Sequence, residues 1–251
     1  MKVLPLFKSQ YSLGRSILTL EGADASVEGG PDSIIDLAIA NKMSKVFLVE
    51  DSMSGFLQAY KNLADQKIKL AFGLRITVCP DIDEKTEESR HKSCKYVLFC
   101  KNENGYHALI KIASDSSRLG FYHEPRIDFA TLQKYWNDDL SLCIPFYDSF
   151  LHKNLLTNSV CIPNFDFTQP TFFFEDNDLP FDFLIQDKLK DYCSKNNYDL
   201  INAKSIFYAK KKDFKAYLTF RCVNNRSTLD KPNLDHMGSD EFSLESWEAC
   251  Q

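Results

Sequence analysis

The sequence lacks the signals of an exported or membrane-spanning protein. No run approaches the roughly 18 consecutive apolar residues that a transmembrane helix needs, and no apolar stretch follows a basic start at the amino terminus. Eight cysteines are present, yet none forms a C-x-x-C pair, and a chain of 251 residues can build a core without disulfides. We therefore expect buried free thiols and a soluble, cytoplasmic protein with no membrane contact.

A surplus of positive charge is also absent. Lys and Arg total 30 against 35 Asp and Glu, which gives a formal net charge of −5. Proteins that bind duplex DNA on their own usually present a basic face. A lysine-rich run at residues 210–215 can touch a phosphate backbone, but such runs are more often the solvated face of a helix. We expect DNA contact to be weak at most.

Aromatic side chains are abundant instead. Phenylalanine occurs 20 times and hydrophobic residues make up 44% of the chain, enough for the packed core of one large or two small domains. Residues 163–183 form a proline-spaced stretch that is especially rich in phenylalanine. An aromatic surface can stack single-stranded bases, but this stretch lacks interleaved Arg or Lys. We therefore expect a loop whose rings fill the core.

The stretch 45–78 has the pattern of a strand–helix–strand unit. Residues 46–49 and 68–72 are short apolar runs, typical of strands that are buried on both faces. Between them, apolar residues recur at three- and four-residue spacing from Phe56 to Ala64, which predicts an amphipathic helix. In α/β units the loop after a strand usually carries the chemistry, and here that loop is Glu50-Asp51-Ser52.

Longer motifs point to a family. Residues 45–78, 97–112 and 120–128, the last reading G-F-Y-H-E-P-R-I-D, resemble the PHP (polymerase and histidinol phosphatase) domain. The resemblance is to the PHP domain at the amino end of bacterial DNA polymerase III alpha subunits, the C-family replicative polymerases. It implies an α/β fold, a distorted (β/α)7 barrel with its helices outside. It also implies a barrel domain over residues 1–223 and a segment over 224–251 that resembles the link to the polymerase palm.

The resemblance also assigns positions to the family's metal site, where His, Asp, Glu and sometimes Cys hold the metal ions that cleave phosphoesters. In this sequence those positions are Leu6, Lys8, Asp51, Ser52, Arg75, Ser205 and Phe207. Of these side chains only Asp51 is a metal ligand, and one carboxylate cannot hold a pair of catalytic metal ions. The pattern predicts a degenerate site with no metal, no cofactor and no catalytic residue.

Two of the replacements bring positive charge to positions where cations would sit. Lys8 and Arg75 flank Asp51 in the implied site. Ammonium and guanidinium groups can pair with a carboxylate through charge-assisted hydrogen bonds. We therefore predict an ion-pair cluster of Lys8, Asp51 and Arg75 that stands in for the lost metals.

Three functions remain open from the sequence. The first is a catalytically inactive PHP-like domain with a structural or docking role in DNA replication, bracing the polymerase palm or binding the proofreading exonuclease. The second is a metal-dependent 3′–5′ exonuclease or phosphoesterase, which intact family members support and the ligand losses oppose. The third is a free-standing PHP-like protein, such as a phage can encode, that binds a replication factor. No palm or fingers sequence follows, so we do not expect the chain as given to polymerise DNA.

Overall fold

A computed structural model describes residues 3–251 except 24, 26, 28 and 231–237. The chain divides into two compact units. Unit 1 comprises Met1–Phe72, Glu175–Asp182 and Asn202–Gln251, and unit 2 comprises Gly73–Phe174 and Phe183–Ile201. The strands β3 (Lys69–Cys79) and β8 (Asp199–Ile206) each have residues in both units.

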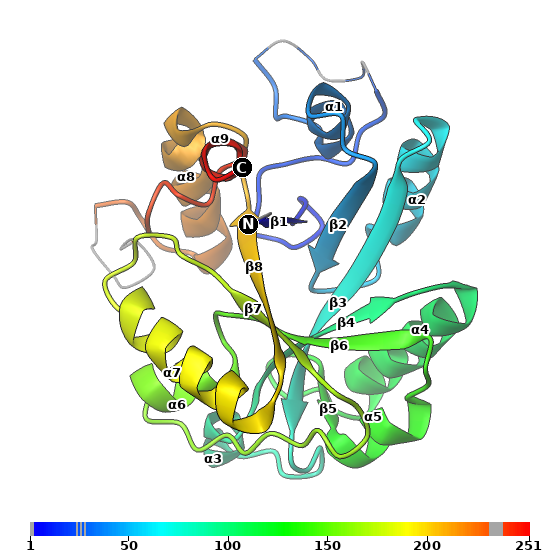
Figure 1. The fold of residues 1–251 in the computed structure, drawn as a ribbon, viewed down its shortest axis with the longest axis vertical. Coiled ribbons are helices and arrows are strands. Elements are labelled where there is room, and N and C mark those ends of the chain that lie inside the picture. The colour runs from blue at the N-terminus through cyan, green and yellow to red at the C-terminus, as the bar shows by residue number, and fades with distance from the viewer. Residues whose placement is uncertain (1–2, 24, 26, 28, 231–237) are drawn as a thin grey trace. The chain divides into compact units, whose positions relative to one another are not determined.

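The strands of unit 1 are parallel and share one carboxyl edge. β1 (Leu4–Phe7) pairs in parallel with β2 (Lys45–Glu50) and with β8, so that Leu6 lies opposite both Phe47 and Ser205. Figure 1 shows these strands in blue and orange. Because parallel strands end on the same side of a sheet, the residues after Phe7, Glu50 and Ile206 come together at that edge.

The helices of unit 1 follow the strands. They are α1 (Ile34–Ala40), α2 (Phe56–Asp65), the 3-10 turn η1 (Lys211–Asp213), α8 (Phe214–Asn225) and α9 (Leu244–Ala249). The hydroxyl of Ser33 accepts a hydrogen bond from Ile35 N at 3.1 Å and caps the start of α1. In α2, Ala59 and Leu63 are fully buried, whereas Leu57 and Tyr60, which share the predicted apolar spacing, are exposed, so the buried face is narrower than that spacing predicts.

Unit 2 contains the antiparallel part of the sheet. β4 (Cys94–Cys100) runs antiparallel to β3 and to β6 (Leu140–Ile144), while β5 (Arg126–Asp128) is parallel to β3 and β7 (Thr171–Phe174) is parallel to β6. The helices that belong to these strands are α3 (Glu87–His91), α4 (Glu103–Arg118), α5 (Phe129–Tyr135), α6 (Phe150–Leu156) and α7 (Asp182–Asn196).

The strand order closes on itself. Along the hydrogen bonds the order is β2-β1-β8-β7-β6-β4-β3-β5, and β2 also pairs with β3. A ring of seven strands results, with β5 extending β3 outside the ring. This confirms the expected α/β barrel, and the antiparallel β4 distorts it from the all-parallel arrangement.

Phenylalanine rings fill the core of unit 2. Phe172 on β7 packs against Phe150 and Phe165 with ring centroids 6.4 and 6.1 Å apart, and it stacks on Tyr198 at 5.6 Å. The core role expected for residues 163–183 is therefore confirmed, although the segment is not all loop, because β7 lies within it. Two of its rings lie outside the core, since Phe181 and Phe183 are 50% and 59% exposed.

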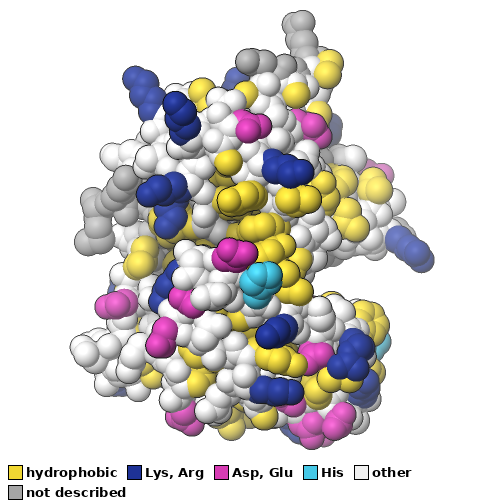
Figure 2. Space-filling view, turned by 90° about the vertical axis from the view of Figure 1, so that its right-hand side faces the viewer, with side chains coloured by type: hydrophobic (Ala, Val, Ile, Leu, Met, Phe, Trp, Pro, Cys, Tyr) yellow, Lys and Arg dark blue, Asp and Glu magenta, His cyan; other side chains and the backbone are white. Residues whose placement is uncertain are grey.

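The cysteines, the helix lengths and the distribution of surface charge agree with what the sequence predicts. All eight cysteines are free and six of them are buried. None of the helices in the described residues is long and apolar enough to cross a bilayer. On the face shown in Figure 2, basic and acidic side chains are interspersed among hydrophobic ones.

Candidate functional site

An ion pair lies at the carboxyl edge of β1 and β2. Lys8 directly follows β1, and its backbone N–H donates to the carbonyl of Ile206 at 3.2 Å, which holds it against β8. Its Nζ lies 3.1 Å from Oδ1 of Asp51, the residue that follows β2. The Lys8 side chain is 8% exposed and that of Asp51 is 32% exposed. The ammonium is therefore almost out of water, and one of its partners is open to solvent.

A second carboxylate lies beneath this pair. Glu50 is fully buried and accepts hydrogen bonds from the backbone N–H of Ser9 at 2.8 Å and from the hydroxyl of Ser12 at 2.5 Å. The same hydroxyl accepts from Asp51 N at 3.0 Å and from Lys8 Nζ at 3.4 Å. We call these five residues, Lys8, Ser9, Ser12, Glu50 and Asp51, the Lys8 cluster.

The charge balance of the Lys8 cluster follows from burial. Desolvation raises the pKa of Glu50 above its usual value, while the nearby Lys8 ammonium and the hydrogen bonds from Ser12 and Ser9 oppose the rise. One nearly buried ammonium thus lies near two carboxylates, that of Glu50 shielded from water and that of Asp51 partly open to it. Such a cluster is expected to be rigid, because breaking either contact leaves a buried charge uncompensated.

The donor set of the Lys8 cluster does not fit a divalent metal ion. A protonated lysine has three hydrogen-bond donors and no lone pair to offer a metal. At the neighbouring position Leu6 is apolar and only 5% exposed. Within the described part of the chain, no group of three or more His, Cys, Asp or Glu side chains is placed to hold a metal.

Ser52, another predicted site position, shapes the turn into α2. Its hydroxyl accepts a hydrogen bond from Ser54 N at 3.3 Å and contacts the Ser54 hydroxyl at 3.2 Å. This is a local serine turn of the kind that often precedes a helix. These hydrogen bonds of Ser52 stay within its own loop, and the residue that joins the Lys8 cluster from this loop is Asp51.

Two further predicted positions lie at the end of β8: Ser205 within the strand carries a hydroxyl, and Phe207 directly after it carries an aromatic ring. Ser205 donates to Glu175 from its backbone N–H and from its hydroxyl, each at 2.9 Å. Glu175 is 3% exposed and also accepts from Asn177 Nδ2 at 3.0 Å. Burial raises the pKa of Glu175 despite these hydrogen bonds. Phe207 stacks on Phe242 with ring centroids 5.2 Å apart, so this position is occupied by core packing.

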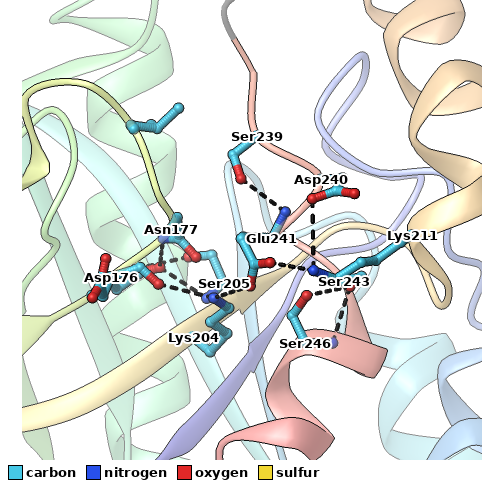
Figure 3. Close-up of polar contacts among 12 residues, drawn as sticks. Asp176, Asn177, Lys204, Ser205, Lys211, Ser239, Asp240, Glu241, Ser243 and Ser246 are labelled. Atoms are coloured by element: carbon cyan, nitrogen blue, oxygen red, sulfur yellow. Dashed lines mark hydrogen bonds and ion pairs between the residues drawn. The ribbon is translucent and has the colours of Figure 1, made fainter.

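A polar network joins β8 to the carboxyl-terminal residues of the chain (Figure 3). Lys204, whose side chain is 4% exposed, donates to the carbonyl of Asp176 at 2.9 Å and to Glu241 at 3.2 Å. Lys211 contacts the same Glu241 carboxylate and lies 3.7 Å from Asp240. Burial alone would raise the pKa of Glu241, but the hydrogen bonds from Lys211 and Lys204 lower it. We call the two contacts of Glu241, with Lys204 and with Lys211, the Glu241 bridge.

Further contacts fix the segment that contains Glu241. The hydroxyl of Ser243 accepts from Ser246 N at 3.1 Å and caps α9. Trp247 Nε1 donates to the carbonyl of Val3 at 2.9 Å, next to β1. Residues 238–251 therefore pack within unit 1, whereas 231–237 of the expected link segment lie outside the described residues.

Arg75, the last predicted position, lies on β3 in unit 2. Its guanidinium forms an ion pair with Asp148. On the paired strand β4, Lys95 contacts Glu124 and the hydroxyl of Thr77, each at 2.5 Å. Burial alone would raise the pKa of Glu124. The Lys95 ammonium, and to a smaller extent the Arg75 guanidinium, lower this pKa below its usual value. The predicted pair of Lys8 and Asp51 is present in unit 1, and the three-residue cluster with Arg75 remains a prediction.

The sequence indicated Glu50 as part of the loop after a strand but assigned it no partner, and it did not indicate the second buried carboxylate, Glu175. Both come directly after apolar strand residues, Val49 in β2 and Phe174 in β7. An acidic residue at the carboxyl end of an apolar strand was the available signal, because this is the edge at which α/β barrels gather functional groups.

Comparison with protein families matches residues 25–160 to the PHP domain. Comparison with curated proteins gives the DNA polymerase III subunit alpha of Thermus aquaticus at 23% identity over 205 residues, which covers 78% of this chain and 17% of the relative. The subunit of Borreliella burgdorferi is 31% identical over 119 residues, 45% of this chain and 10% of its own. That of Aquifex aeolicus is 32% identical over 91 residues, 34% of this chain and 8% of its own. The chain thus spans less than a fifth of the length of these relatives.

Proposed function

Because this chain belongs to the PHP-domain family, we propose that it acts in DNA replication as a metal-free structural and protein-docking domain. Its relation to DNA polymerase III alpha subunits confirms the resemblance that the motifs indicated. The polymerase activity in the name of those relatives belongs to much longer proteins. The proposal for this chain concerns the part that it shares with them.

The Lys8–Asp51 ion pair carries this proposal. It lies at the carboxyl edge of β1 and β2, where the family holds its metals, and it places a covalently attached positive charge there. A divalent cation at that point would be repelled by an ammonium a few ångströms away in surroundings of low dielectric constant. The carboxylates of Glu50 and Asp51 already have a cationic partner, and a fold that supplies its own cation needs no metal to keep its shape.

Arg75 is proposed as the second built-in cation. The observation in favour is its sequence position, which the family resemblance assigns to a metal ligand. Its contact with Asp148 keeps the guanidinium partly buried, with 11% of the side chain exposed. A double-mutant cycle of Asp51→Ala and Arg75→Ala tests whether the two residues interact. Additive losses of stability would remove Arg75 from the cluster.

The carboxyl-terminal segment is proposed as a link from the barrel domain of residues 1–223 to a palm-like domain. The Glu241 bridge supports this role, because it ties the segment around Glu241 to β8 through Lys204 and to η1 through Lys211. A link held in this way would keep the proposed palm-like domain at a fixed position relative to the barrel.

Docking requires an accessible surface, and unit 1 offers one beside α2. Leu57 and Tyr60 are 58% and 56% exposed, and Leu13 is 71% exposed. The hydrogen bond from the Tyr11 hydroxyl to Gln58 Oε1, 2.8 Å long, brings residues 11–13 next to this helix. Exposed apolar side chains grouped in this way are typical of protein contacts. The partners proposed are the polymerase palm and the proofreading exonuclease.

A hydrolysis assay tests the proposal against the enzymatic alternative. Purified protein would be incubated with a 3′-labelled single-stranded DNA oligonucleotide and Mn²⁺. We expect no turnover above a protein-free control. Metal-dependent cleavage that disappears in Asp51→Ala would instead support a 3′–5′ exonuclease. Pull-down with purified exonuclease, clamp and clamp-loader subunits tests the docking role, and binding to none of them would contradict it.

A further inference from the structure

Two turns of unit 1 have the same geometry. Both α1 and α2 end in a Schellman motif, in which two N–H groups beyond the helix bond back to carbonyls of its last turn. After α1 these donors are Lys42 N and Met43 N, with bonds of 3.0 and 2.9 Å. After α2 they are Lys67 N and Ile68 N, with bonds of 2.9 Å each. The chain therefore leaves both helices along the same path.

In each motif a lysine occupies the residue with left-handed backbone. The φ angle is +51° at Lys42 and +58° at Lys67. Glycine is the usual residue in this conformation and asparagine comes next, because a Cβ is crowded there. After α6 and α7 the left-handed residues are indeed asparagines, Asn158 and Asn197. Backbone preference therefore does not explain a lysine at both turns of unit 1.

A second lysine follows each turn where the next strand begins. Lys45 is the first residue of β2, and Lys69 is the first residue of β3. Lys69 N donates to the carbonyl of Ser44 at 3.1 Å, so the two strand starts lie side by side. All four lysines are exposed. We call Lys42, Lys45, Lys67 and Lys69 the lysine patch.

The positive charge of the lysine patch is not neutralised locally. Among the described residues, none of its four ammonium groups is held in an ion pair. Residues 41–45 and 66–69 contain no acidic side chain, and the nearest acid in the sequence is the exposed Asp65. The helix dipole favours a cation within the last turn of a helix, but Lys45 and Lys69 lie beyond it. Four like charges on adjacent turns repel one another, and a polyanion relieves that repulsion.

We propose that the lysine patch binds the phosphate backbone of duplex DNA without reading its sequence. The choice of DNA among polyanions rests on the replication role proposed above. Lysine suits this task, because its ammonium is a point charge that contacts phosphates of any sequence. The ring beside the patch, Phe47, packs against the Lys45 ammonium at 4.6 Å and cannot stack on an unpaired base at the same time. A duplex, whose phosphates are displayed without unstacking, is therefore the better fit. With a formal net charge of −5 on the whole chain, the binding is weak and sensitive to salt.

Fluorescence anisotropy of a labelled duplex, about 20 base pairs long, tests the proposal at KCl concentrations of about 50 to 200 mM. If four lysines contact phosphates, the logarithm of the association constant falls with the logarithm of salt concentration with a slope of about −3.6, or roughly 150-fold over this range. The patch variant combines Lys42→Asn, Lys45→Gln, Lys67→Asn and Lys69→Gln. We expect its affinity at the lowest salt to fall by about tenfold or more and its salt dependence to flatten.

A control variant removes the same amount of charge elsewhere. It combines Lys111→Gln, Lys188→Gln, Lys195→Gln and Arg226→Asn, all at exposed positions, and Arg226 has a left-handed φ of +52°. This control should keep the affinity and the slope of the parent protein. Equal losses in the two variants would show that net charge and not the patch attracts DNA, and would overturn the proposal. No binding by the parent protein at the lowest salt would overturn it too.

Stability measurements separate binding from folding. Asparagine accepts the left-handed conformation, so the melting temperature of the patch variant should not fall. If that variant fails to fold, Lys45→Gln with Lys69→Gln alone should halve the salt slope, and Lys45→Arg with Lys69→Arg should keep it. An unchanged slope in the glutamine pair would contradict the proposal.

Two further measurements identify the partner. Poly-glutamate that displaces the duplex as well as unlabelled duplex does, at equal charge, would assign the patch to an acidic protein and overturn the assignment to DNA. The patch variant should still bind purified exonuclease if the parent protein does. Loss of exonuclease binding in a parent that binds no DNA would overturn this inference and leave the proposed docking function intact.

Discussion

The Lys8 ammonium and the Asp51 carboxylate form an ion pair, with Nζ 3.1 Å from Oδ1. The pair joins the residues that follow β1 and β2 at the carboxyl edge of parallel strands, the edge that carries the chemistry in α/β barrels. In this chain that edge holds a fixed cation between two carboxylates. The role proposed for the pair is to take the structural place of a bound ion.

Replacing Asp51 with alanine should destabilise the fold. The change leaves a nearly buried ammonium with Glu50 as its remaining carboxylate neighbour. Since about a third of the Asp51 side chain is exposed, we expect a loss of about 1–2 kcal/mol, or roughly 2–6 °C in melting temperature. Asp191→Ala removes an exposed helical ion pair with Lys195 and should change stability by less than about 0.5 kcal/mol. Equal melting temperatures for Asp51→Ala and the parent protein would contradict a structural role for the pair.

The buried carboxylate of Glu50 should make stability fall as pH rises. Its pKa is raised in the folded state above the ordinary value of 4.5, so folding favours its protonated form. The stability that this group contributes is complete below 4.5 and is lost as pH rises through the folded pKa. In Glu50→Gln this loss is absent, and the melting temperature of the variant minus that of the parent should increase with pH above 4.5.

Melting curves at closely spaced pH values measure this difference. Glu103→Gln is the control, because the Glu103 side chain is 88% exposed, and its difference from the parent should be flat. A difference for Glu50→Gln that is flat would show that folding does not shift the pKa of Glu50, and one that decreases with pH would show that folding lowers it; either result contradicts the prediction.

Removing the charge of Glu241 should loosen the end of the chain. Glu241→Gln breaks the ionic contacts with Lys204 and Lys211, and we expect a loss of about 1–2 kcal/mol. Hydrogen exchange of residues 239–247 should rise more than that of β1 or β2. Glu248→Gln, at an exposed position on α9, should leave exchange unchanged. Equal protection of the segment in Glu241→Gln and the parent protein would remove the Glu241 bridge as its anchor.

Arg126 should be the most sensitive arginine of unit 2. It is 1% exposed and donates to the carbonyls of Gly120, Ile82 and Glu84 and to the hydroxyl of Ser89 at 3.1–3.3 Å. A lysine cannot make this set of contacts, so Arg126→Lys should cost about 2–4 kcal/mol.

Urea unfolding measures the loss. Arg118→Lys, at a position whose side chain is 69% exposed, should change little. If both variants unfold at the same urea concentration, the contacts of Arg126 with residues 82–89 do not contribute to stability.

The surroundings of Arg126 also explain two residues of the motif at 120–128, the glycine at its start and Arg126 itself. A Cβ on Gly120 would lie 1.9 Å from the Arg126 carbonyl oxygen, so the first residue of the motif must be glycine. Thr86 and Ser89 form a capping box that starts α3, and Arg126 binds that Ser89. The charged segment 80–92 therefore contains a short helix that contacts Arg126 through Ser89.

The parts of the fold that could be predicted are those specified by local pattern. Apolar runs and helical spacing predicted the bounds of β2 and α2 within one residue, because both patterns depend only on residues that are close together in the sequence. The Lys8–Asp51 pair followed from the family resemblance, since parallel strands place their ends side by side.

The parts that could not be predicted depend on contacts between distant residues. Glu50 meets Ser9 across 41 positions, Glu175 meets Ser205 across 30, and Glu241 meets Lys204 across 37. Burial of these carboxylates is a property of the closed barrel, and no local pattern distinguishes them from surface acids. For the same reason the strand β7 was not recognised, because prolines and phenylalanines around it resemble a packed loop.

The most direct test of the central claim is a titration of the purified, metal-stripped protein with Mn²⁺, in which free ion is measured by electron paramagnetic resonance. If the Lys8–Asp51 pair has replaced the metals, the free-ion signal should rise in proportion to added Mn²⁺ with no saturable uptake. Stoichiometric binding in the micromolar range that disappears in Asp51→Ala would contradict it.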